Sequence, residues 1–186
     1  SEMQRMYYTE QNALLIDGYR QKIEDMFLAK EITEQQYYWA LASLVEAADR
    51  VANTASVYGA FLKAFKKTAQ QELKLTPMPY TTKEGQHNEV YQEDANTLVK
   101  KISGDVLYLD PPYNERQYGA NYHVLNRIIE NKDFSSEKKT GLIDYNKSDY
   151  CKKNVAQKSL RDLIEKANFP YIFISYNNEG IIAEDE

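Results

Sequence analysis

The sequence predicts an α/β fold, in which a helical module precedes a module built on a parallel sheet. Two short apolar runs rich in β-forming residues, 106–109 and 169–176, are too short for core helices and indicate buried strands. Residues 150–167 carry apolar side chains on one helical face and are expected to connect the two strands. With 186 residues, the chain is long enough for one domain or for one domain with an insertion.

Two helices are expected at the start of the chain. Residues 10–27 show apolar side chains at helical spacing, which predicts the first helix. Thr33 followed by Gln36 is the signature of a capping box, so a second helix is expected to begin just after Thr33.

The helical spacing then continues to about Leu73, which is too long for one ordinary helix. A kink or turn is therefore expected at Asn53, Thr54 and Ser56, or at Gly59. Prolines at 77 and 79 end the helical region. We accordingly predict a helical module at 1–78 and a partial α/β core at 79–186.

The second module is expected to begin with a short strand at 89–91, followed by a helix that Asp94 opens. Asp94 is then either an ordinary N-cap or a site residue at a strand-to-helix switch. A further helix is expected at 121–129, and residues 131–147 form a long polar connection of the kind that is often functional or disordered.

The stretch from Asp110 to Tyr113 is the strongest candidate for a functional site. Asp110 directly follows the apolar run, and open α/β sheets bind ligands outside the carboxyl ends of their strands. Pro111 and Pro112 fix the chain direction there. Acceptor oxygens followed by the ring of Tyr113 suit a planar group that bears an NH2. The alternative is a strand that simply ends at a proline turn, with Asp110 as a cap and Tyr113 covering the core.

Composition excludes several classes of protein. The net charge of −5 argues against holding nucleic acid by a general basic field, although a local basic face is compatible with it. Cys151 is the single cysteine and His87 and His123 are far apart, so neither a disulfide framework nor a metal site is expected. No apolar run approaches the roughly 18 residues of a membrane span, and a cytoplasmic location is expected. Sixteen tyrosines fit a protein that stacks bases, although most are expected in the core.

Several stretches resemble one family. Asp-Pro-Pro-Tyr at 110–113, with Asn-Glu-Arg-Gln-Tyr at 114–118 and Asn-Tyr-His-Val-Leu-Asn at 121–126, resembles a DNA adenine methyltransferase of the Dam-like class. Segments 47–54, 57–61, 139–142 and 175–180 resemble the same class. The resemblance implies a Rossmann-like methyltransferase sheet with an α-helical insertion for target recognition. It also implies N6 methylation of an adenine flipped out of duplex DNA, with S-adenosylmethionine as donor, in a restriction-modification system.

The resemblance also assigns roles to individual residues, and no metal is needed. The catalytic residues would be Asp110, Pro111, Pro112 and Tyr113. The donor would be bound by Asp94 and Asp110. Nucleic acid would be bound by Arg116, Gln117, Asn121, Tyr122, Lys138 and Lys139, although a run of lysines is more often only a solvated face. The alternatives are an RNA adenine methyltransferase and a catalytically incomplete remnant that binds DNA.

One departure from the family concerns glycine. The family has a glycine-containing donor loop after its first strand, whereas all seven glycines here are isolated. We therefore expect the chain to be an internal or truncated piece of a longer methyltransferase that lacks an N-terminal segment. The strand at 106–109 would then present an open edge, which is expected to pair with a second copy in a homodimer or to be partly disordered.

Overall fold

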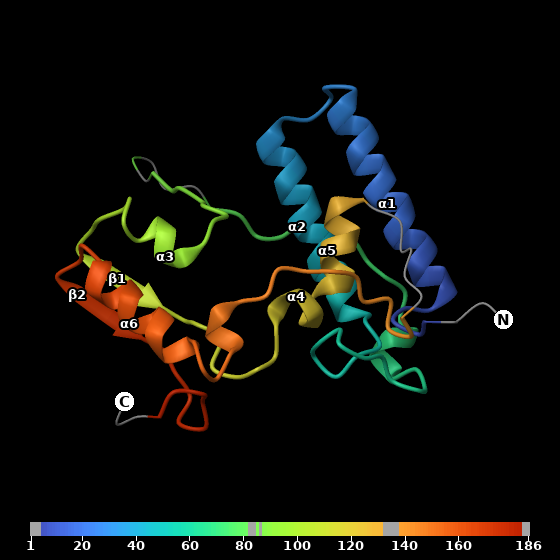
Figure 1. The fold of residues 1–186 in the computed structure, drawn as a ribbon. Coiled ribbons are helices and arrows are strands. Elements are labelled where there is room, and N and C mark those ends of the chain that lie inside the picture. Colours follow the sequence, from blue (N-terminus) through green and yellow to red (C-terminus); the bar gives the residue numbers. More distant parts are fainter. Residues whose placement is uncertain (1–4, 82–84, 86, 132–137, 184–186) are drawn as a thin grey trace. The chain divides into compact units, whose positions relative to one another are not determined.

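The computed structural model describes residues 5–81, 85, 87–131 and 138–183, and it divides into two compact units (Figure 1). Unit 1 comprises Ser1–Thr81 and Tyr118–Tyr145, and unit 2 comprises Thr82–Gln117 and Asn146–Glu186. Within the described ranges, no helix is both long and apolar enough to cross a membrane.

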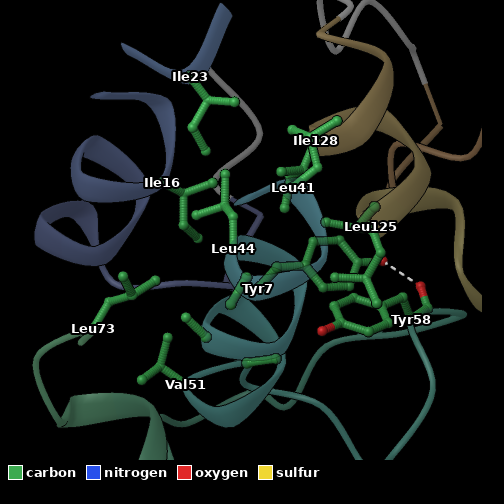
Figure 2. Packing of buried hydrophobic residues seen from close by; sticks show 14 residues of the cluster. Tyr7, Ile16, Ile23, Leu41, Leu44, Val51, Tyr58, Leu73, Leu125 and Ile128 are labelled. Carbon is green, nitrogen blue, oxygen red and sulfur yellow. Dashed lines mark hydrogen bonds between the residues drawn. The ribbon is translucent and has the colours of Figure 1, made fainter. Parts of the chain in front are cut away.

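Unit 1 is built on three helices, α1 (Glu10–Leu28), α2 (Glu34–Arg50) and α5 (His123–Glu130), with the short α4 (Tyr118–Asn121) and the 3-10 turn η1 (Lys67–Gln70). The three longer helices pack on one another around a buried apolar cluster (Figure 2). Its labelled members are Tyr7, Ile16, Ile23, Leu41, Leu44, Val51, Tyr58, Leu73, Leu125 and Ile128.

The predicted starts of α1 and α2 are confirmed. The amide of Gln36 donates to Thr33 Oγ1 at 3.2 Å, and the amide of Thr33 donates to Gln36 Oε1 at 2.8 Å, which completes the capping box. Thr9 caps α1 by accepting a hydrogen bond from the amide of Asn12. Each cap satisfies donors that the first helical turn leaves without partners and stabilises its helix by about 1 kcal/mol.

The expected break at Asn53 and Thr54 is present, since α2 ends at Arg50, but the expected helix beyond it is wrong, because between Arg50 and Leu73 only η1 is helical. The reason is Asn53, which is fully buried. Its side chain donates to the carbonyls of Met6 at 2.9 Å and Leu62 at 3.1 Å and accepts the amide of Lys66 at 3.0 Å. These bonds close residues 54–65 into a loop by offering backbone groups partners outside a helix.

Unit 2 contains α3 (Ala95–Leu98), β1 (Val106–Leu109), the 3-10 turn η2 (Asp149–Cys151), α6 (Ala156–Lys166) and β2 (Tyr171–Ile174). The strands β1 and β2 pair in parallel, with Val106 opposite Tyr171 and Leu109 opposite Ile174. The predicted α/β class is thus confirmed at the level of a mixed fold with a small parallel sheet. The expected strand at 89–91 is wrong: the structure assigns none there, and Val90 is 96% exposed.

The prediction that both strands are buried is also wrong. Val106 and Tyr108 of β1 are 55% and 64% exposed, and Tyr171 and Phe173 of β2 are 64% and 58% exposed. Leu107, by contrast, is half-buried, so burial alternates along β1. A strand is buried on both faces only where other elements cover both, and the described part of unit 2 covers one.

The expected boundary at residue 78 lies close to the observed division after Thr81, but one later segment departs from it. Residues 118–145 belong to unit 1, because Val124, Leu125 and Ile128 of α5 contribute to the core between α1 and α2. The expected helix at 121–129 is present as α4 and α5. Within the connection at 131–147, residues 132–137 lie outside the described part of the chain. The division into functional domains at 1–78 and 79–186 stays a prediction.

Candidate functional site

A cavity of about 850 Å³ lies in unit 2 at the carboxyl end of β1. Its lining includes Asp94, Asn96, Asp110, Pro111, Pro112 and Tyr150. Three sequence segments therefore meet there: the start of α3, the turn after β1, and η2 with the following α6. The volume lies within the range that holds a nucleoside-sized ligand.

Asp110 takes its place from the parallel ladder. Ser175 donates its amide to the carbonyl of Leu109 at 2.8 Å, so the pairing of the two strand segments extends to the residue just before Asp110. Asp110 itself is exposed, and the two prolines after it are half-buried against the cavity. Because each proline fixes its own φ, the carboxylate is carried by a stiff turn.

Tyr113 is partly exposed, and its backbone is held. Its carbonyl accepts the amide of Ile181 at 2.8 Å, and the residue is 41% exposed. The ring therefore does not cover the core, as the proline-turn alternative required. An exposed ring on a held backbone is available for stacking.

Asp94 is the N-cap of α3, which is one of the two roles that the sequence allowed for it. Its Oδ1 accepts the amide of Thr97 at 2.9 Å and the hydroxyl of Thr97 at 3.1 Å. The same residue lines the cavity and is exposed. The cap bonds use Oδ1, and a carboxylate has a second acceptor oxygen, so capping and ligand binding are compatible.

The sequence did not single out Asn96 and Tyr150, which join the walls of the cavity. The hydroxyl of Tyr150 donates to Asn96 Oδ1 at 2.7 Å, and Asn96 Nδ2 donates to the carbonyl of Ser159 and to Asp162 Oδ2, both at 2.9 Å. Burial, together with the charges of Asp94, Asp162 and Asp149, raises the pKa of Tyr150 to about 12. Its hydroxyl therefore stays protonated and serves as a donor.

Asp162 is the fixed acceptor of this group. Hydrogen bonds from Lys166 and Asn96 lower the pKa of its carboxyl below the usual value. Asn96 lies more than 50 positions from both Tyr150 and Asp162, and no local sequence pattern marks these pairs.

The predicted nucleic-acid-binding residues are divided between the units. In unit 2, Arg116 is exposed. The amide group of Gln117 is used within the protein, since its Nε2 donates to the carbonyl of Ser148 at 3.2 Å and its Oε1 accepts the amide of Ser148 at 2.7 Å. Gln117 is therefore less available to a ligand than the sequence suggested.

The other four predicted residues, Asn121, Tyr122, Lys138 and Lys139, belong to unit 1. The carbonyl of Asn121 accepts the amide of Tyr58 at 2.6 Å, and the ring of Tyr122 is 39% exposed. The carbonyl of Lys138 accepts a hydrogen bond from the guanidinium of Arg5, and the Lys139 side chain is exposed. The structure describes these four only within unit 1.

The described residues contain no group of three or more His, Cys, Asp or Glu side chains placed to hold a metal ion. The acidic residues of the cavity act instead as hydrogen-bond acceptors, as Asp94 and Asp162 show.

Comparison with known proteins decides the family. The model of the D12 class N6 adenine-specific DNA methyltransferases matches residues 1–186. The chain belongs to this family. That result confirms the DNA adenine methyltransferase family predicted from Asp-Pro-Pro-Tyr and its flanking segments.

Curated relatives agree with the family. The chain is 51% identical over 183 residues to the Type II methyltransferase M.NlaIII of Neisseria lactamica. It is 41% identical over 182 residues to the Type II methyltransferase M.CviAII of Paramecium bursaria Chlorella virus 1. It is also 41% identical over 185 residues to the Type II methyltransferase M.FokI of Planomicrobium okeanokoites.

These alignments cover 98% of the chain but only part of each relative. The chain spans 54% of the length of M.NlaIII and of M.CviAII, and 28% of M.FokI. No solved structure matches the chain.

Proposed function

We propose that the protein transfers a methyl group from S-adenosylmethionine to N6 of an adenine in duplex DNA, as the modification enzyme of a restriction-modification system. One observation carries this proposal: Asp110 and the two prolines after it line a nucleoside-sized cavity at the carboxyl end of a parallel strand. The family and the Type II methyltransferase relatives support it. In this proposal β1 and β2 are part of a Rossmann-like sheet.

The cavity suits the methyl donor. Asp94 contributes a carboxylate acceptor for the polar groups of a nucleoside, and half-buried Pro111 and Tyr150 contribute apolar surface. Asp110 lies at the boundary between the cavity and the exposed turn that carries Tyr113. When bound, S-adenosylmethionine supplies an electrophilic methyl group on a sulfonium.

The turn after β1 suits the target amine. The lone pair of an exocyclic aromatic amine is delocalised into its ring, so the amine is a poor nucleophile. Hydrogen bonds from the amine to the Asp110 carboxylate and the Pro111 carbonyl would draw it toward tetrahedral geometry and free that lone pair. The exposed ring of Tyr113 would stack on the flipped base and replace the stacking lost from the duplex.

Contacts to DNA complete the proposal. Arg116, Asn121, Tyr122, Lys138 and Lys139 would contact the phosphates or the region around the flipped base. Gln117 would act indirectly, by holding Ser148 beside the cavity. The helices of unit 1 would form the target-recognition module.

The decisive test is methyl transfer to matched DNA and RNA oligonucleotides by the protein and its Asp110→Ala variant. Loss of an acceptor at the reacting amine is expected to slow turnover by at least about 100-fold, the usual effect of a lost electrostatic stabiliser. Asp105→Ala is the matched control, because this exposed carboxylate lies just before the amino end of the same strand. Near-normal turnover of Asp110→Ala would refute its role.

The same assay separates the alternative functions. Transfer to RNA in preference to DNA would favour the RNA enzyme. Binding of DNA without transfer by the unaltered protein would favour the non-catalytic remnant.

A further inference from the structure

Resting on the proposed function, we infer that Asn96 is a positioning residue that holds Asp94 and Tyr150 in place for the nucleoside half of the donor. Asn96 lies two residues after Asp94, and both line the cavity together with Tyr150. Hydrogen bonds within the chain would thus keep the cavity in the shape that the donor needs.

The helix α3 cannot hold itself in place. It has four residues, and a helix that short has little stability of its own, so its position depends on tertiary contacts. Asn96 supplies such contacts, because its Nδ2 donates to the carbonyl of Ser159 and to Asp162 Oδ2 on α6. The Asp94 cap is thereby attached to α6 through Asn96.

Asn96 also holds η2. The hydroxyl of Tyr150 donates to Asn96 Oδ1 at 2.7 Å, while the amide of Tyr150 donates to Ser148 Oγ at 3.2 Å. Tyr150 is thus held by its hydroxyl and by its backbone amide where it lines the cavity. A fixed ring beside a carboxylate acceptor suits a nucleoside, since a base packs against a ring and hydroxyl groups donate to a carboxylate.

The chemistry of this junction selects asparagine. A primary amide offers two donors and an acceptor oxygen, and Asn96 uses both its N–H side and its oxygen here. Aspartate is nearly the same shape but has no donor, and its charge would face Asp162, whose carboxyl stays ionised beside Lys166. Asn96→Asp therefore puts an acceptor where Asn96 donates to Ser159 and Asp162, while the volume of the side chain stays nearly constant.

The test is calorimetric binding of S-adenosylhomocysteine and of adenosine to the full protein. In Asn96→Ala and Asn96→Asp we expect affinity for both ligands to fall by about tenfold or more, the equivalent of one or two hydrogen bonds. In turnover assays the donor KM should rise by a similar factor, while kcat at saturating donor changes by no more than about twofold.

Two further variants complete the test. Tyr150→Phe keeps the ring and removes the hydroxyl, with its bond to Asn96 and its longer contact to the carbonyl of Ser159 at 3.5 Å, so a smaller loss is expected. The double variant with Asn96→Ala should lose less than the sum of the two. Asn154→Ala is the control, since this exposed asparagine of unit 2 is outside the cavity lining. The affinity of this variant for both ligands should be unchanged.

The outcomes separate this inference from the proposed function. Unchanged ligand affinity in Asn96→Asp and Tyr150→Phe, in a protein that methylates DNA, would overturn the inference and leave the function in place. Affinity lost for S-adenosylhomocysteine but not for adenosine would also overturn it, because the nucleoside would not be what Asn96 positions. Absence of methyl transfer by the unaltered protein would instead refute the proposed function.

Discussion

Truncation of the Asn53 side chain should destabilise unit 1 strongly. Asn53 is fully buried, and its side chain serves three backbone groups: the carbonyls of Met6 and Leu62 and the amide of Lys66. Asn53→Ala removes all three partners at once. Each buried backbone group that loses its partner costs about 1–3 kcal/mol, and water entry recovers part of that cost. We expect a total loss of about 2–5 kcal/mol in the free energy of unfolding.

Urea unfolding measures this loss through the shift in midpoint at a similar slope. Asn53→Asp keeps the acceptor for Lys66 but removes both donors and buries a charge, so its loss should be at least as large. Asn126→Ala, at an exposed asparagine of α5, is the matched control and should stay within about 0.5 kcal/mol of the unaltered protein. A loss below about 1 kcal/mol for Asn53→Ala would show that the loop 54–65 does not depend on this side chain.

The remaining predictions concern the ring of Tyr113 and the protonation of His123. Tyr113→Ala should weaken binding to duplex DNA, measured by fluorescence titration, by about 1–3 kcal/mol, which is what stacking of one base contributes. Tyr113→Phe should bind DNA almost as tightly as the unaltered protein, because the ring remains. Equal losses of affinity in the Phe and Ala variants would contradict stacking. His123 is 3% exposed, with Nε2 2.9 Å from the carbonyl of Tyr58, and burial lowers its pKa below 6.5. Between that lowered pKa and 6.5 the unfolded chain binds more protons than the folded one, so stability should fall as the pH drops below 6.5. Urea midpoints from pH 7.5 to 5 should show this fall, and His123→Gln should reduce it; the same slope in both proteins would assign the pH dependence elsewhere.

Local sequence patterns predicted the parts of the fold that local physics determines. The capping box of Thr33 and Gln36 lies within four residues, and the structure contains it. The run at 106–109 was too short for a helix and rich in β-forming residues, and it is β1. The backbone groups that the capping box pairs are neighbours in the sequence, and the residue types at 106–109 favour a strand by themselves.

Patterns failed where a side chain competes with the backbone over long distances. The sequence predicted a kink or turn at Asn53 and Thr54, but nothing near Asn53 indicates that Met6, 47 positions away, offers it a carbonyl or that the helical region ends there rather than continuing to Leu73. Asn96 and Tyr150 are similar, because their bond joins residues 54 positions apart. The stretch at 110–113 could be recognised because its residues are consecutive, whereas the residues that hold the cavity around it are scattered.

The strands were predicted to be buried, but one face of the observed sheet is exposed, and the open edge of that sheet lies next to the site. Val106 and Tyr108 lie opposite Tyr171 and Phe173 in the parallel register, so these four apolar side chains form one exposed row. Within the described residues, β1 has a paired strand on one side only. Pairing of that open edge with a second copy or a further strand stays a prediction, but its consequence for the site follows from the chain itself. Because Asp110 is bonded directly to Leu109, any strand that pairs along the open edge of β1 also restrains the carboxylate, and order at the edge and order at the site should rise together.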